Sequence, residues 1–113
     1  MEKLKLYILW TTDNLITSEK MVLMYAQNGI LRQWWDEVNV VIWGASAKLV
    51  AENPMIQEKI KMAMHTGVKF FACKGCSDQL CVSDELSKLS IEVAYWGGGL
   101  SEVLQNGEKL ITI

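Results

Sequence analysis

Residues 70–81 read Phe-Phe-Ala-Cys-Lys-Gly-Cys-Ser-Asp-Gln-Leu-Cys, and this stretch holds all three cysteines of the chain. The apolar run over residues 68–73 turns abruptly polar at Lys74 and Gly75. Such a run, followed by small residues and then by Ser-Asp, predicts a buried strand that ends at Cys73 and leads into a short helix. We therefore expect the sulfur of Cys73 at the carboxyl end of a strand, beside the amino end of a helix.

That position makes Cys73 the first candidate for chemistry. Free backbone N–H groups and the helix dipole favour an anion at the amino end of a helix, and Lys74 adds a nearby positive charge. Both effects stabilise a thiolate, which is the nucleophilic form of cysteine. The alternative is inert burial, because free cysteine is among the most buried residue types. The stretch alone leaves both interpretations open.

The size and composition of the chain predict one globular domain over residues 1–113. A chain of 113 residues buries about two-thirds of its unfolded surface. Half of the residues are hydrophobic and 21% are charged, which excludes intrinsic disorder. The net charge of −2, with scattered Lys and Arg, argues against a nucleic-acid partner, since such partners require a basic surface.

The first residues and the cysteine count predict a cytoplasmic protein. The segment Met1–Lys5 leads directly into a strand pattern and lacks the layout of a secretory signal. No apolar run approaches the roughly 20 residues that cross a bilayer, so no membrane partner is expected. Three cysteines cannot form a closed disulfide framework, which fits a reducing compartment.

Apolar segments at residues 4–10, 38–43, 68–73, 91–95 and 109–113 predict five strands. Helical patterns lie between them, at residues 18–35, 47–52 and 54–66. A further helix is expected to start within residues 82–86, and a last one starts at Ser101 and ends before Gly107. Strands that alternate with helices imply right-handed crossovers and a parallel sheet. The expected fold class is therefore α/β, as a three-layer α/β/α arrangement around a five-stranded, mainly parallel sheet.

Local signals set the expected ends of these helices. Thr17 or Ser18 is expected to cap the first helix. Ser83 is expected to cap the helix that starts directly after Ser83. Asn53 and Pro54 predict a cap and a first helical position. The segment Gly97-Gly98-Gly99 reads as a loop after the fourth strand, where the backbone turns tightly or approaches a partner closely. Residues 21–26 are apolar on every side of their helix, which predicts a second cover, such as another subunit.

Ligands of an open parallel sheet bind beyond the carboxyl ends of its strands. Tryptophans Trp10, Trp43 and Trp96 end the first, second and fourth strands, where they form either an aromatic rim around a thiol or caps on the core and subunit contacts. Asp13 could orient a thiol partner, although a solvated loop carboxylate is the commoner role. The predicted pocket consists of the polar, aromatic and glycine residues that follow the strands: Thr12, Asp13, Trp43, Gly44, Ser46, Lys74, Trp96 and Gly97.

Cys73 and Cys76 form a Cys-x-x-Cys pair whose surroundings differ from those of a dithiol oxidoreductase. The only proline of the chain lies elsewhere, and Lys74 and Gly75 separate the two cysteines. A zinc site needs four ligands, and only Cys81 and His65 could complete one, so no metal is expected. No phosphate-binding fingerprint is present, and no cofactor is predicted.

The order of these motifs resembles that of the DsrE/DsrF-like family, which includes the sulfur-relay subunit TusD. The resemblance covers nearly the whole chain. It rests on Thr11-Thr12-Asp13 after the first strand, on Trp43-Gly44-Ala45-Ser46-Ala47-Lys48-Leu49 after the second, on Gly67-Val68 at the start of the third, on Ala72-Cys73-Lys74-Gly75-Cys76 at its end, and on the segments Ile91-Glu92-Val93 and Leu110-Ile111-Thr112.

The resemblance implies a flavodoxin-like fold and assembly into homo-oligomers, usually trimers or hexamers. In the sulfur-relay members, a cysteine at the position of Cys73 carries a persulfide and passes it to a partner protein. Cys81 stands where the family often has a glycine before the valine. The resemblance thus implies sulfur donor and acceptor proteins as partners.

Three functions follow as competing hypotheses. In the first, Cys73 is the catalytic residue of a sulfur carrier, and Cys76 resolves its persulfide, which releases sulfide and leaves a disulfide. The second is a non-catalytic oligomeric binding module, and the third is a thiol redox sensor.

Cys73 and Cys76 are expected within reach of one another, whereas Cys81, which follows Leu80, is expected in the core.

Overall fold

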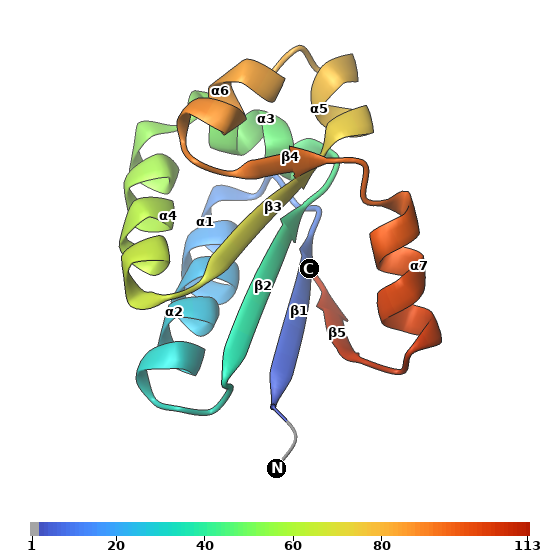
Figure 1. Ribbon diagram of the computed structural model, residues 1–113. Helices are drawn as coiled ribbons and strands as arrows, with labels where there is room; N and C mark the ends of the chain where they lie inside the picture. Colours follow the sequence, from blue (N-terminus) through green and yellow to red (C-terminus); the bar gives the residue numbers. More distant parts are fainter. Residues whose placement is uncertain (1–2) are drawn as a thin grey trace.

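The computed structural model describes residues 3–113. Met1 and Glu2, which belong to the segment used above to predict the location, lie outside these residues. At the centre is one sheet whose strands are β1 (Lys5–Trp10), β2 (Glu37–Ile42), β3 (Lys69–Cys73), β4 (Glu92–Ala94) and β5 (Lys109–Thr112). Their order is β4-β3-β2-β1-β5, and every neighbouring pair is parallel (Figure 1).

Helical segments connect these strands, and their bounds are α1 (Leu15–Thr17), the π-helical segment η1 (Ser18–Leu23), α2 (Met24–Leu31), α3 (Ala45–Glu52), α4 (Pro54–Thr66), α5 (Lys74–Gln79), α6 (Ser83–Lys88) and α7 (Gly97–Gln105). The chain moves from β1 to β4 in one direction across the sheet and then returns past β1 to β5. Because parallel crossovers are right-handed, the reversal places α7 on the opposite face from α2 and α4 (Figure 1). The predicted three-layer α/β/α fold is therefore confirmed.

The core lies between the sheet and the layer that contains α2 and α4. Leu6, Ile8 and Trp10 alternate along β1 and are buried, while the residues between them are half-buried. Strand β2 is buried throughout from Val38 to Ile42, as expected for a central strand that is covered on both faces.

The first helix differs from its predicted bounds. It begins at Leu15 and its last segment ends at Leu31, and the Asn14 side chain caps it by accepting a hydrogen bond of 2.8 Å from the Thr17 N–H. The predicted cap Ser18 is instead fully buried, where its hydroxyl accepts a 3.1 Å hydrogen bond from Trp10 Nε1. A buried indole N–H needs an acceptor, so the packing of Trp10 decides the role of Ser18.

The predictions for the helix at residues 54–66 are confirmed, because the Asn53 side chain accepts from the Ile56 N–H and Gly67 ends the helix. Two other predictions were wrong. The three glycines at residues 97–99 form the first turn of α7 rather than a loop, because buried Val103 anchors that helix against the sheet. The Ser83 hydroxyl donates to Asp78 and does not cap α6.

Candidate functional site

The carboxyl ends of β1, β2 and β3 bring three segments together. These strands are direct neighbours in the sheet and share one direction, so the loops after them meet at a single edge (Figure 1). The segments are Thr11–Asn14 after β1, Trp43–Gly44 after β2, and the start of α5 after β3. This edge is where an open parallel sheet binds its ligands.

Cys73 and Cys76 lie next to each other at this edge. Cys73 ends β3, occupies the N-cap position of α5 and is 7% exposed, and its carbonyl accepts a 2.8 Å hydrogen bond from the Ser77 hydroxyl. Cys76 lies three residues further along α5, is half-buried, and is hydrogen-bonded through its side chain to Cys73. The structure therefore places the two cysteine side chains near each other, as the spacing predicted.

The environment of Cys76 disfavours its thiolate. Burial is the largest effect and raises the pKa of Cys76, and the hydrogen bond and charge of Cys73 raise it further. The backbone N–H of Gly44 opposes this shift by donating to the Cys76 sulfur. Gly44 has φ +75° and ψ −129°, a conformation that favours glycine, and it caps α3 without any side chain.

A cavity of about 430 Å³ opens beside Cys76. Two residues of the predicted pocket, Asp13 and Gly44, contribute to it. Cys76, which was predicted as a catalytic residue, also lines the cavity, and the lining residues outside the predicted site are Ala45, Lys48, Gln79 and Leu80. Lys48 could have been found from the sequence, because it lies four residues after Gly44 and therefore faces the same side of α3.

Other predicted pocket residues hold the edge together instead of lining the cavity. The Ser46 hydroxyl is fully buried, donates to the Trp10 carbonyl and accepts from the Trp43 N–H, so it joins the ends of β1 and β2. The Thr12 hydroxyl accepts a 3.1 Å hydrogen bond from the Asn14 N–H. These contacts give both residues a structural role in the loops that carry the site.

The side chains of Lys74 and Trp96 contact residues outside the cavity. Lys74 Nζ lies 2.7 Å from Asp78 Oδ2 and 5.6 Å from the centre of the Tyr95 ring, so its charge is compensated within α5. The Trp96 ring packs on Phe71, with 5.3 Å between ring centroids, and Gly97 begins α7. Trp10 is fully buried, so for this tryptophan the interpretation as a core cap is correct and the rim is wrong.

Cys81 is exposed, and the prediction that it packs in the core was wrong. It follows the end of α5 with φ +59°, and its N–H donates to the Asp78 carbonyl. This left-handed backbone turns the chain from α5 toward α6 and carries the side chain outward. Glycine adopts this backbone conformation at the lowest cost.

Residues 3–113 contain neither a cluster of metal ligands nor a helix that could span a membrane. In that part of the chain, no three His, Cys, Asp or Glu side chains gather as a metal site would require. His65 is exposed in the last turn of α4. Across the same residues, none of the helices combines the length and the apolar character needed to span a bilayer.

Three solved structures are similar to this chain, one of them also in sequence. Protein BT1422 from Bacteroides thetaiotaomicron, a conserved protein of unknown function, is 43% identical, with a TM-score of 0.94 over 96% of this chain and 94% of its own. Protein MTH1491 from Methanobacterium thermoautotrophicum, also of unknown function, is 16% identical, with a TM-score of 0.74 over 97% and 99% of the two chains. The YchN protein from E. coli is 14% identical, with a TM-score of 0.72 over 99% and 100%.

At these two lower identities the likeness shows a common fold alone. No protein with a curated description matches the chain. The sequence profile of the DsrE/DsrF-like family, however, matches residues 9–113, which is nearly the entire chain. The chain therefore belongs to the DsrE/DsrF-like family.

Proposed function

We propose that this protein is a sulfur carrier, in which Cys73 accepts a persulfide sulfur and passes it to a partner protein. The observation that carries the proposal is the position of Cys73 at the carboxyl end of β3, with Cys76 beside it in the first turn of α5. The chain is a member of the DsrE/DsrF-like family, and the family resemblance implies a persulfide on the cysteine at the position of Cys73. One thiol receives the sulfur, and its neighbour controls how long the sulfur stays.

The environments of the two cysteines support Cys73 as the acceptor. Burial and the neighbouring Cys73 sulfur raise the pKa of Cys76, so Cys76 keeps its proton at pH values where an ordinary cysteine begins to ionise. A thiol that keeps its proton is a poor nucleophile. Cys76 is therefore suited to donate its S–H toward Cys73 and to react later.

The chemistry balances without an added oxidant. The Cys73 thiolate attacks the outer sulfur of a donor persulfide, a new S–S bond forms, the S–S bond of the donor breaks, and the donor leaves as a thiolate. An acceptor thiolate then attacks the outer sulfur on Cys73 and restores the Cys73 thiolate. In the competing reaction, Cys76 attacks Cys73 Sγ, which forms the Cys73–Cys76 disulfide and releases hydrogen sulfide.

Mass spectrometry can test the proposal without any substitution, because Lys74 separates the two cysteines. Trypsin cleaves after lysine, so residues 70–74 carry Cys73 alone and residues 75–88 carry Cys76 and Cys81. After incubation with inorganic polysulfide and blocking with an alkylating agent, we expect one added sulfur on the peptide of residues 70–74. Sulfur found only on the other peptide would overturn the assignment to Cys73.

The same pair of cysteines favours a second candidate, a thiol redox sensor. Two thiols in hydrogen-bond contact can be oxidised to a disulfide, which removes two hydrogens and links the two tryptic peptides. That product, formed by a mild oxidant while polysulfide adds no sulfur, would favour the sensor. A protein that changes in neither experiment would instead be a binding module.

We also propose that the chain acts as a homo-oligomer, and trimers or hexamers are expected from the family resemblance. Met21 and Met24 are 39% and 48% exposed on the helix that was predicted to be covered twice. Trp34 is 49% exposed and stacks on Tyr25 with 5.8 Å between ring centroids. Sedimentation should give a mass above that of one chain, and Trp34→Glu should lower it if this surface is buried between subunits. A monomer at micromolar concentration would contradict the proposal.

A further inference from the structure

Gly75 leaves open space directly beside the Cys73 sulfur. It is the second residue of α5, and a Cβ atom placed on its backbone would lie 3.9 Å from Cys73 Sγ. Apart from the chain neighbours of Gly75 and the backbone of its own helix, no other atom would lie within 4 Å. The side chain that is absent here would therefore occupy a space that borders on the thiol.

The local backbone gives no reason for glycine at this position. The φ of Gly75 lies outside the left-handed range, unlike that of Gly44 at +75° and Gly67 at +121°. Glycine weakens a helix relative to alanine, so the helical conformation alone would favour a side chain. The space next to Cys73 Sγ is the feature that an alanine would change.

We propose that Gly75 is a positioning residue that keeps room for the outer sulfur of a persulfide on Cys73. The inference rests on the proposed function for the identity of the group that fills the space. Cys73 is 7% exposed, so space for an additional atom beside its side chain is scarce. The position of the missing Cβ of Gly75, 3.9 Å from Sγ, borders directly on the sulfur.

The distances show why one methyl group matters. An outer sulfur lies about 2 Å from Sγ, as in any S–S bond. A methyl carbon 3.9 Å from the same Sγ contacts the free thiol at an ordinary distance and leaves the unmodified protein undisturbed. When the outer sulfur points toward residue 75, however, it would come well inside the roughly 3.5 Å at which two non-bonded atoms pack. Alanine should thus be tolerated before loading and resisted during it.

Gly75→Ala tests the inference, and Gly98→Ala is its matched control. Gly98 also lies in the first turn of a helix without left-handed φ, and a Cβ there would meet no atom within 4 Å. Two rates are measured on the tryptic peptide of residues 70–74: sulfur addition from inorganic polysulfide, and alkylation by iodoacetamide. Thermal unfolding of each variant shows that it folds, and we expect the midpoint to rise by about 2–5 °C in both.

We expect Gly75→Ala to slow both reactions of Cys73 about tenfold, while Gly98→Ala leaves them unchanged. Equal rates in the two variants would overturn the role of Gly75 even if the unmodified protein loads sulfur. If the unmodified protein takes up no sulfur but Gly75→Ala still slows alkylation, the result supports the space beside Cys73 Sγ and contradicts the sulfur-carrier function. If neither Gly75→Ala nor Gly75→Ser folds, the space is already filled, and the inference is overturned.

Discussion

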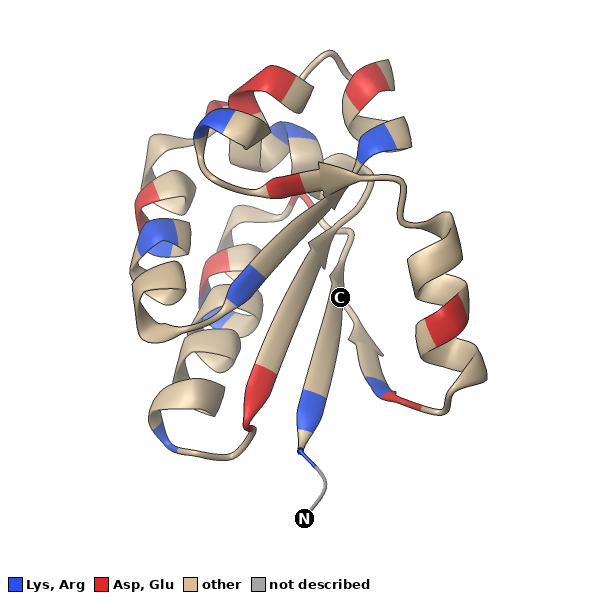
Figure 2. Ribbon diagram, in the orientation of Figure 1, with Lys and Arg blue, Asp and Glu red and all other residues tan. Residues whose placement is uncertain are grey.

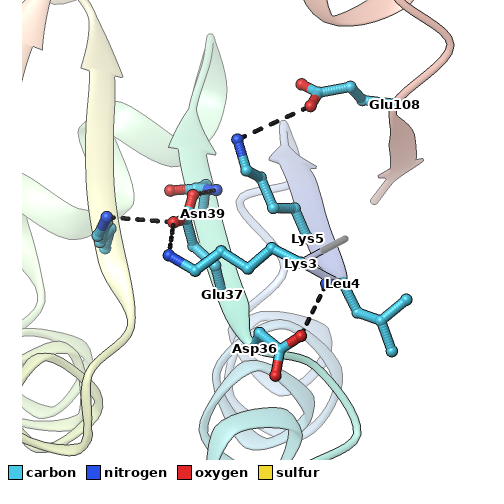
Figure 3. A network of polar contacts seen from close by, with 8 residues as sticks. Lys3, Leu4, Lys5, Asp36, Glu37, Asn39 and Glu108 are labelled. Carbon is cyan, nitrogen blue, oxygen red and sulfur yellow. Dashed lines mark hydrogen bonds and ion pairs between the residues drawn. The ribbon is translucent and has the colours of Figure 1, made fainter. Parts of the chain in front are cut away.

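The two ends of the same sheet carry different kinds of residues. At the amino ends of the strands, charged side chains pair across the sheet: Glu37 Oε1 lies 3.4 Å from both Lys3 Nζ and Lys69 Nζ, and the Asn39 amide donates to Glu37 Oε2 at 2.9 Å (Figure 3). Lys5 lies 3.9 Å from Glu108 at the same edge. The carboxyl halves of β1, β2 and β3 contain no charged residue (Figure 2).

At the carboxyl edge, the thiol pair and the cavity take the place of this network. Within residues 3–113, neither Asp13 nor Lys48 forms an ion pair, although both line the cavity. The amino edge thus uses its charges to join neighbouring strands, whereas the carboxyl edge keeps the charges of Asp13 and Lys48 available beside the cavity. Substitutions at the two ends should therefore separate stability from chemistry.

Cys73→Ser should have the largest effect, a complete loss of persulfide loading. Serine lacks the sulfur nucleophile, and its hydroxyl does not ionise near neutral pH. Loading is measured by the mass of the whole protein after incubation with polysulfide, with Cys81→Ser as the control because Cys81 is exposed. Loading of Cys73→Ser at the unmodified rate would move the nucleophile to Cys76.

Cys76→Ser should leave loading intact and lengthen the lifetime of the persulfide about tenfold, because the resolving thiol is absent. The pH dependence gives a second test. The raised pKa of Cys76 means that its thiolate is scarce at neutral pH, so sulfide release from the loaded protein should accelerate as the pH rises beyond the ordinary cysteine pKa. A release rate that is independent of pH, or unchanged in Cys76→Ser, would exclude Cys76 as the resolving group.

Glu37→Gln should change stability and leave the chemistry unaffected: sulfur loading should be unchanged, and the free energy of unfolding should fall by about 1 kcal/mol. The loss is small because the lysine partners of Glu37 are largely exposed. The hydrogen bond from Asn39 lowers the pKa of Glu37, as do Lys69 and Lys3, so the charged form stabilises the folded state. This contribution is present above the ordinary value of 4.5 and is lost as the pH falls through the lower pKa of the folded state.

In urea unfolding, the free energy of unfolding of Glu37→Gln should therefore be lower than that of the unmodified protein at pH 7. In acid, where Glu37 is protonated, the two values should become equal. Glu58→Gln is the matched control, because Glu58 pairs with Lys61 on a helix surface and is 70% exposed. A loss of sulfur loading in Glu37→Gln would show that the two ends of the sheet are coupled.

Cys81→Gly should have the smallest effect, a gain of about 0.5–1 kcal/mol in the free energy of unfolding. The backbone of Cys81 has φ +59°, which glycine adopts without the steric cost of a Cβ. Cys81→Ala retains the Cβ and should give no such gain. Both variants should load sulfur normally, and a defect in either would place Cys81 in the chemistry.

The sequence by itself determined the features that depend on local periodicity and capping. The apolar run that ends at Cys73 gave a strand followed by a helix, and Asn53 and Gly67 marked the ends of α4, because these signals act between residues close in the chain. The alternation of strands with helices was enough for a parallel α/β sheet. It also placed Cys73 and Cys76 together, since they share one turn of one helix.

Only the tertiary structure decided which side chains meet across the fold. Ser18 became the partner of the Trp10 indole instead of a cap, and the Ser46 hydroxyl joined the ends of β1 and β2 instead of lining the cavity. Packing of Val103 drew three glycines into a helix that their propensity disfavours. Such outcomes depend on contacts between residues whose neighbourhood is set only when the strands have been ordered. The order of the strands likewise follows from the packing of the whole sheet, which no single segment of the chain encodes.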